Sequence, residues 1–289
     1  MIVERTQPWL GTYVSIRVEG LDAVEAHCAI TAAFEHTATV HRLMSFHEAA
    51  SDVTRLNREG TLRAVTVHPS TFAVLQWAQR FASLSHGCFD ISVGAELVEW
   101  GLLPSPCGSV TSPSGSWRDI ELLPKGQVLF HRPLWIDLGG IAKGYAVDKA
   151  IECLLERGAE HCVVNAGGDI RVQGNRTELI RLQVESPGTA AVVELTNGSV
   201  ASSCGWQRKR CIGGKLRGPH LDGADRTTSW TDRFVCVVAD HCVVADALTK
   251  VVMAQGAQSA NLLRQFGAKA HVFDPGGGWM HLPAREDAG

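Results

Sequence analysis

Alternation of hydrophobic and polar positions predicts strands in both halves of the chain. Thr12 to Val18 alternates cleanly, as a strand with one buried face does. Phe234 to Val238 and His271 to Phe273 are further strand candidates. Leu179 to Glu185 and Ala190 to Leu195 predict a hairpin pair, and a turn follows them.

Apolar residues at helical spacing predict several helices. They cover Ala23 to Met44, Ser70 to Ser85, Val244 to Ala254 and Ala260 to Phe266, and a further helix ends before Gly158. Strand-rich parts flank these helices without strict alternation of strand and helix. We therefore expect an α+β fold, with residues 1–289 forming one compact unit of two intimately packed lobes.

Two glycine pairs mark the centre of the chain. Trp135 to Leu138 is predicted to be a short buried strand that leads into Gly139-Gly140 and a helix. A second strand, Cys162 to Val164, leads to Gly167-Gly168. Lys143 would lie in the first turn of the helix, where a cation opposes the helix dipole, so its place suggests a nearby anion such as a phosphate. The alternative is a solvated lysine beside glycines that serve only tight turns.

Composition argues against nucleic-acid binding and against a membrane-spanning helix, and it bears on where the protein is located. The formal net charge of −3 over 289 residues gives no footprint for nucleic acid, and the apolar runs are too short to span a bilayer. The nine cysteines include no C-x-x-C pair, and most, such as Cys28 and Cys153, are predicted to be small core residues. As the sequence stands, we expect a reduced, cytoplasmic protein. A periplasmic or membrane-anchored location would follow if a leader had been trimmed.

The central stretch resembles the ApbE family, the FAD:protein FMN transferases. The family pattern D-L-G-G-x-A-K-G-Y-A-x-D, followed by N-x-G-G-D, is nearly complete at Asp137 to Asp148 and Asn165 to Asp169. Other family motifs recur in the same order and cover almost the whole chain: Leu10-Gly11-Thr12, Met44-Ser45-Phe46, Phe89 to Val93, Ser202-Ser203 with Arg208, and Ala245 to Leu248. The resemblance implies an ApbE-like fold related to the T-fold.

This resemblance implies a phosphoryl-transfer reaction. FAD would bind across a cleft, FMN would pass to a Ser or Thr of a partner flavoprotein, and AMP would leave. Two alternatives remain open. A Mg²⁺-dependent FAD pyrophosphatase would use water as the acceptor and release FMN and AMP, and a binding protein would hold FAD without turnover.

The resemblance also implies which residues contact FAD. They are Leu10, Phe46, Cys88, Phe89, Asp90, Lys143, Lys149, Gly167 and Gly168. At the Phe46 position the family usually has Tyr, so the ring that could stack on flavin is kept and the hydroxyl is lost. The structural alternatives are a core phenylalanine at Phe46 and a cap or turn acid at Asp90.

His220 is the candidate general acid–base group. The family carries H-H-x-x-D-P-x-T-G, whereas this chain has Pro219 to Thr227, with a single histidine and no Asp-Pro in register. A histidine suits proton transfer near neutral pH. The alternative is an inert loop histidine.

A magnesium site is implied at Asp246, Thr249 and the backbone carbonyl of Ala146. Mg²⁺ requires oxygen ligands in near-octahedral geometry, but Lys250 stands where the family has Thr. We therefore expect weak Mg²⁺ binding. Two other interpretations remain: an ordinary salt bridge between residues four apart on a helix, or an ammonium group that replaces the metal and contacts the pyrophosphate.

Overall fold

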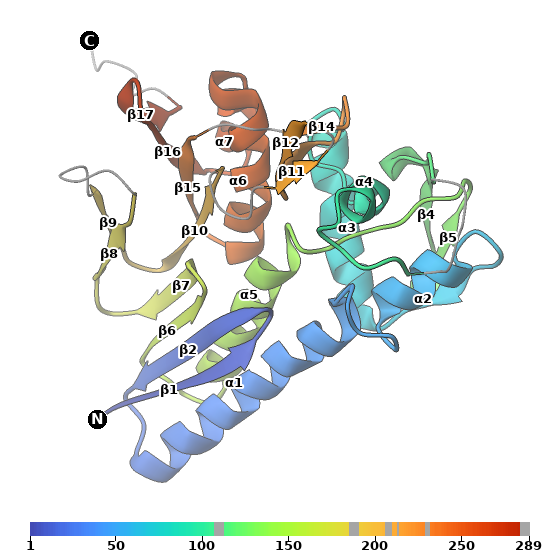
Figure 1. Ribbon diagram of the computed structural model, residues 1–289. Helices are drawn as coiled ribbons and strands as arrows, with labels where there is room; N and C mark the ends of the chain where they lie inside the picture. The colour runs from blue at the N-terminus through green and yellow to red at the C-terminus, as the bar shows by residue number, and fades with distance from the viewer. Residues whose placement is uncertain (107–112, 185–190, 206–209, 213, 229–231, 284–289) are drawn as a thin grey trace. The chain divides into compact units, whose positions relative to one another are not determined.

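The chain divides into two compact units. The computed structural model describes residues 1–106, 113–184, 191–205, 210–212, 214–228 and 232–283 (Figure 1). The first unit comprises residues 1–39, 143–204 and 232–289, and the second comprises residues 40–142 and 205–231. Each unit contains both helices and strands, in agreement with the predicted α+β class.

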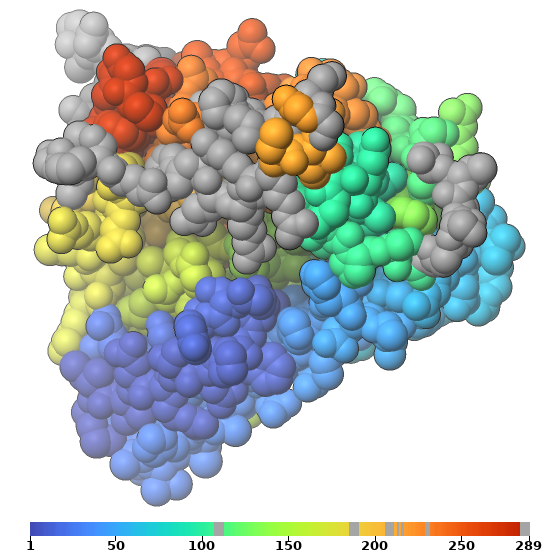
Figure 2. All heavy atoms as spheres, viewed as in Figure 1, coloured from blue at the N-terminus to red at the C-terminus, as the bar shows by residue number. Residues whose placement is uncertain are grey.

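An eight-stranded antiparallel sheet forms the centre of the first unit. In spatial order its strands are β1 (Ile2–Trp9), β2 (Thr12–Glu19), β6 (His161–Ala166), β7 (Asp169–Gly174), β10 (Gly198–Cys204), β15 (Phe234–Ala239), β16 (Lys269–Asp274) and β17 (Gly278–Leu282). A separate hairpin consists of β8 (Glu178–Leu182) and β9 (Ala191–Leu195). β1 alternates between exposed and partly buried residues and lies at the surface, in dark blue in Figure 2.

Helices cover one face of this sheet, as Figure 1 shows. They are α1 (Ala23–Met44), which continues into the second unit, α5 (Ala142–Glu156), α6 (Cys242–Gln255) and α7 (Ala260–Gln265), with a 3₁₀ turn at Gly256–Ser259. Val14, Ile16 and Val18 alternate along β2 and are fully buried in a core that they share with α1 and α5. Burial of this apolar face provides the main driving force for the packing.

The second unit combines helices of different lengths with a three-stranded sheet. Its helices are α2 (Asp52–Glu59), α3 (Pro69–Leu84) and α4 (Gly94–Glu99), and its sheet has the order β3 (Val65–Thr66), β5 (Gln127–Phe130), β4 (Ile120–Leu123). Two small hairpins pair β11 (Arg210–Ile212) with β12 (Lys215–Arg217), and β13 (Leu221–Asp222) with β14 (Thr227–Thr228). Short 3₁₀ turns cover Trp117–Asp119 and Pro124–Gly126.

The predicted elements are mostly confirmed. The predicted helix Ala23 to Met44 has the same bounds as α1. The strands predicted from Thr12, Phe234 and His271 correspond to β2, β15 and β16, and the predicted hairpin corresponds to β8 and β9, although residues 185 and 190 lie outside the described residues. β1 and β17 were not predicted.

The strand predicted at Trp135 to Leu138 is wrong. Trp135, Ile136 and Leu138 are buried, but the segment pairs with no strand. The Ile136 amide donates to the Asn57 side chain at 2.7 Å, and the Asp137 amide donates to the Ile91 carbonyl at 2.8 Å. Single bonds to separate segments satisfy this backbone, so hydrophobicity alone could not distinguish it from a strand.

Two further sequence expectations can be compared with the structure. Cys28 is exposed on α1, so its prediction as a core residue is wrong, whereas Cys153 is buried. Helical spacing places Cys28 off the apolar face that α1 packs inward. Within the described ranges, every helix is too short or too polar to cross a lipid bilayer.

Candidate functional site

Two tight turns lie side by side at one end of the large sheet. Leu10 and Gly11 connect β1 to β2, and Gly167 and Gly168 connect β6 to β7. All four residues have positive φ, between 56° and 100°. A Cβ atom on Gly167 would lie only 3.0 Å from the Cβ of Thr12, so glycine is required for this close approach.

Lys143 forms an ion pair beside the second turn. Asp169 is the first residue of β7, and its buried Oδ2 pairs with the Nζ of Lys143, from the first turn of α5. The same Nζ lies 3.8 Å from Oδ2 of Asp246. Burial would lower the pKa of the Lys143 ammonium, but the charges of Asp169 and Asp246 outweigh it and raise that pKa above its ordinary value. Lys143 is therefore a cation at neutral pH, with 29% of its side chain still exposed.

Asp246 lies fully buried on α6, and all of its oxygens are bonded. Oδ1 pairs with the Lys250 ammonium, and Oδ2 accepts the amide of Gly144 at 3.0 Å. Its backbone carbonyl accepts from Lys250 Nζ at 2.9 Å and from the Thr249 hydroxyl at 2.7 Å. Burial would raise the pKa of the Asp246 carboxyl, but Lys143 and Lys250 lower it below its ordinary value. We call Lys143, Asp169, Asp246 and Lys250 the lysine–aspartate cluster.

Gly144 allows α5 and α6 to approach closely. A Cβ atom at this position would overlap the carbonyl oxygen of Cys242 and lie 2.8 Å from the Cβ of Asp246. Glycine at this position therefore has a packing role, which adds to the turn role of the glycine pairs.

A second buried ion pair orients α6. Asp148 of α5 accepts the amides of Cys242 and Val243, both at 2.9 Å, and the guanidinium of Arg171 at 2.7 Å. Its carboxylate thus caps the first turn of α6, one turn before Asp246. Sequence reasoning gave this aspartate no role, although it ends the family motif and interrupts an apolar helix.

As they are arranged here, the predicted magnesium ligands do not fit a divalent cation. Ala146 is buried on α5, while the Thr249 hydroxyl donates to the Asp246 carbonyl and lies 2.9 Å from the hydroxyl of Ser203. The only carboxylate of the set is already bonded to Lys250. Across the described part of the chain, no three His, Cys, Asp or Glu side chains gather in a way that could hold a metal. Mg²⁺ requires free oxygen ligands, and the side-chain oxygens of Asp246 and Thr249 are already hydrogen-bonded within the protein.

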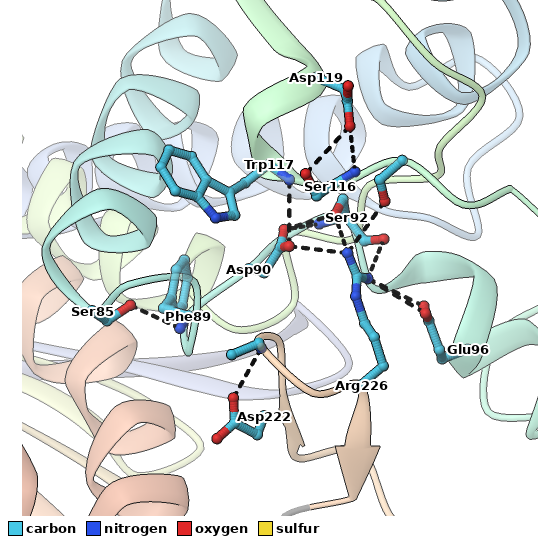
Figure 3. A network of polar contacts seen from close by, with 12 residues as sticks. Ser85, Phe89, Asp90, Ser92, Glu96, Ser116, Trp117, Asp119, Asp222 and Arg226 are labelled. Carbon is cyan, nitrogen blue, oxygen red and sulfur yellow. Dashed lines mark hydrogen bonds and ion pairs between the residues drawn. The ribbon is translucent and has the colours of Figure 1, made fainter.

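In the second unit, Asp90 is the centre of a polar network (Figure 3). Its Oδ1 accepts the amide and hydroxyl of Ser92 at 2.7 and 2.8 Å. Its Oδ2 accepts Nη2 of Arg226 at 3.0 Å and the amide of Trp117 at 3.3 Å. Burial raises the pKa of Asp90, and Arg226 opposes that shift. Both carboxylate oxygens are therefore used within the unit.

Arg226 holds the β13–β14 hairpin against the Asp90 segment. Its guanidinium also donates to the carbonyls of Ser92 and Gly115, at 2.9 and 3.2 Å, and lies 3.4 Å from Glu96. On the same hairpin the amide of Gly223 donates to the carbonyl of Cys88 at 2.9 Å. No sequence pattern pointed to Arg226, but Asp222-Gly223 is a turn dipeptide that could have revealed the hairpin.

The remaining predicted site residues occupy different surroundings. In the second unit, Phe46 is 6% exposed, Cys88 and Phe89 are buried, and His220 is partly exposed just before β13. Burial, together with the charge of Asp222, raises the pKa of the Cys88 thiol to about 12. In the first unit, Lys149 pairs with Glu152 on α5 at 2.5 Å. Arg208 lies outside the described residues.

The structure therefore brings only part of the predicted site together within one unit. Lys143, Asp246 and Thr249 converge near the glycine turn, and Leu10 lies in the adjacent turn. Phe46, Cys88, Phe89, Asp90 and His220 belong to the second unit.

Comparison with solved structures first defines the class of fold. The crystal structure of the ApbE protein from Thermotoga maritima matches with a TM-score of 0.85, covering 98% of this chain and 97% of that one at 25% identity. The chain is thus an α+β protein with the fold of that protein. The model of the ApbE family matches residues 10–273, and the chain belongs to the ApbE family. This confirms the predicted family and fold class.

Two curated relatives have the same description. A protein of Vibrio cholerae serotype O1 is 26% identical over 235 residues, which cover 75% of this chain and 70% of the relative. A protein of Treponema pallidum is 26% identical over 301 aligned positions, which cover 93% of this chain and 83% of that relative. Both are described as FAD:protein FMN transferases.

Proposed function

We propose that this protein transfers FMN from FAD to a Ser or Thr hydroxyl of a partner flavoprotein and releases AMP. Its membership in the ApbE family and the description of its relatives support this reaction. One structural observation carries the proposal: the Lys143 ammonium is held in its charged form by two aspartates and remains partly exposed beside a glycine turn. This arrangement suits the phosphates of a dinucleotide.

The glycine turn offers space for a ligand next to Lys143. A Cβ atom on Gly168 would have no neighbour within 4 Å, although the backbone there is ordered by a 2.9 Å bond from its amide to Asn165. A phosphate could therefore approach the backbone closely while Lys143 neutralises part of its charge. Asp169 and Asp246 orient the lysine before the ligand arrives, which reduces the cost of ordering it on binding.

The reaction exchanges one phosphorus–oxygen bond for another. The acceptor hydroxyl oxygen attacks the FMN phosphorus, the bond to the AMP phosphate breaks, and AMP leaves with the electron pair of that bond. Lys143 stabilises the negative charge on the phosphates during this exchange. We propose His220, on the family pattern, as the base that takes the hydroxyl proton.

The family pattern also assigns FAD contacts to Leu10, Phe46, Cys88, Phe89, Asp90 and Lys149. For Asp90 we propose a positioning role, because Ser92, Trp117 and Arg226 already use both of its carboxylate oxygens. It would hold the Cys88–Phe89 segment in shape for the ligand. Phe46 would offer only a small part of its surface to the ligand, since it is 6% exposed.

Incubation of the purified protein with FAD and a bacterial extract tests the proposal. Transfer is expected to release AMP and to leave a flavin-fluorescent protein band on a denaturing gel, with the modified Ser or Thr identified by mass spectrometry. AMP and free FMN without a labelled protein would show a pyrophosphatase instead. FAD binding without AMP would show a binding protein, and both results would overturn the transferase.

A further inference from the structure

The contacts of Lys250 distinguish it from a surface lysine. Residues four apart on an exposed helix face commonly form weak, solvated ion pairs. Here Asp246 is completely buried, and the Lys250 side chain is only 17% exposed. The ammonium is therefore directed into the protein, against the carboxylate that the family resemblance assigns to magnesium.

Lys250 occupies a position from which it bonds two oxygens of one residue. Its Nζ pairs with Oδ1 of Asp246 and donates to the backbone carbonyl of the same residue at 2.9 Å. An ammonium has three N–H donors. Among the described residues, the Lys250 ammonium donates only these two hydrogen bonds, both to Asp246. One N–H thus remains for an oxygen that comes from outside the described chain, such as a phosphate oxygen or water.

The charges of the lysine–aspartate cluster already balance. Two carboxylates, those of Asp169 and Asp246, are paired there with two ammonium groups, those of Lys143 and Lys250. A divalent cation added beside both lysines would bring two further positive charges to this cluster, and uncompensated charge in a buried place is strongly unfavourable. To reach Oδ1 of Asp246, the cation would also have to displace Lys250.

Thr249, the second side chain predicted to bind the metal, is also already hydrogen-bonded within the protein. Thr249 is fully buried and donates its only hydroxyl proton to the Asp246 carbonyl, so the 2.9 Å contact with Ser203 places that serine as donor to Thr249. These two hydrogen bonds hold the Thr249 side chain in place, and Lys250 keeps its bonds to Asp246 in the same arrangement. The two ligand positions thus form one connected arrangement around an ammonium ion.

We propose that Lys250 supplies at Asp246 the positive charge that a divalent metal would otherwise supply, and that this protein binds FAD without a metal. The proposal deepens the proposed function, because the ligand of the two lysines would be the FAD pyrophosphate. Lys143 and Lys250 approach the same buried carboxylate and offer two cations to neighbouring phosphate oxygens.

Manganese titration of the FAD-free protein tests this proposal without any turnover. The electron paramagnetic resonance signal of free Mn²⁺ is followed for the wild type, for Lys250→Thr, and for Lys269→Thr as a control at an exposed lysine of β16. The wild type and the control are expected to show no saturable binding up to millimolar Mn²⁺. Lys250→Thr is expected to bind one Mn²⁺, because it removes the competing charge and adds a hydroxyl oxygen.

FAD titrations with EDTA or with Mg²⁺ provide the second arm. The FAD affinity of the wild type is expected to be the same in EDTA and in Mg²⁺. The FAD affinity of Lys250→Thr should be about 10- to 100-fold lower than that of the wild type in EDTA, and it should be restored by Mg²⁺. Lys250→Arg keeps the positive charge, so its FAD affinity should not depend on metal. This variant keeps the proposal testable if Lys250→Thr does not fold. Saturable Mn²⁺ binding by the wild type, or loss of its FAD affinity in EDTA, would overturn the proposal. Absence of FMN transfer would overturn the proposed function alone, since the manganese arm uses neither FAD nor an acceptor.

Discussion

The amide nitrogen of Gly144 lies 3.0 Å from Oδ2 of Asp246 and donates a hydrogen bond to it. This bond joins the first turn of α5 to the buried side of α6. It needs a backbone approach that a side chain at position 144 would block, because its Cβ would overlap the Cys242 carbonyl. The glycine in the Lys143-Gly144 pair thus sets the distance between the two helices that carry the lysine–aspartate cluster.

Gly144→Ala is therefore expected to destabilise the fold by about 1–3 kcal/mol, the usual cost of overpacking a well-packed core. Urea unfolding followed by circular dichroism measures this loss. Gly277→Ala is the matched control, since its Cβ would have no neighbour closer than 3.9 Å. Equal unfolding midpoints for the two variants would show that α5 and α6 can separate freely.

Lys143→Ala is expected to weaken FAD binding by about 1–3 kcal/mol, the range for a charged hydrogen bond. The reason is the loss of the partly exposed ammonium beside the glycine turn. Fluorescence titration with FAD measures the change, and Lys269→Ala serves as an exposed control on β16. Superimposable titration curves for wild type and Lys143→Ala would remove Lys143 from the FAD site.

Asp148→Asn should destabilise the protein by about 3–5 kcal/mol, because it leaves Arg171 as a buried charge without its partner. The two side chains are only 5% and 9% exposed. Thermal unfolding measures the effect. As a comparison, Glu59→Gln in the exposed pair with Arg63 should cost less than about 1 kcal/mol. A loss of similar size in both variants would contradict the importance of the buried pair.

His220→Ala is expected to slow AMP release by about 10²–10⁴-fold while leaving FAD affinity nearly unchanged, as removal of a general base does. Rapid quench and chromatography of AMP give the rate. His27→Ala, at an exposed position of α1, is the control. An unaltered rate would rule out His220 as the base and return it to an ordinary loop histidine.

His271 is expected to make stability depend on pH. Burial, with the charges of His281 and Lys269 nearby, lowers the pKa of His271 below its ordinary value, and its Nδ1 lies 2.9 Å from Nδ1 of His281. The unfolded chain, with a histidine pKa of about 6.5, then binds more protons than the folded chain, so stability is present above that pH and is lost as the pH falls toward the lower folded pKa. Urea midpoints at pH 7 and pH 5 should differ less for His271→Gln than for the wild type. An equal difference would show that other groups cause the acid sensitivity.

Local patterns in the sequence determined much of the fold. Helical spacing defined α1 with its observed bounds, and alternation defined β2, because one buried face imposes a regular repeat on each element. The motifs from Asp137 to Asp169 indicated the family and located Lys143, and the motif from Ala245 to Leu248 located Asp246. The pairing of Asp246 with Lys250 was also foreseeable, since residues four apart meet on a helix.

Only the tertiary structure decided which charges lie inside and what they bond. Asp148 meets Arg171 across 23 positions, and Asp90 meets Arg226 across 136, separations that no local repeat encodes. The same holds for Trp135 to Leu138, where partners from distant segments replace a ladder. The burial of the Lys250–Asp246 pair was likewise invisible in the sequence, because the depth of a helix face depends on what packs against it. Because a buried carboxylate must be neutralised by the charges around it, the burial of Asp246 separates its pair with Lys250 from an ordinary surface salt bridge.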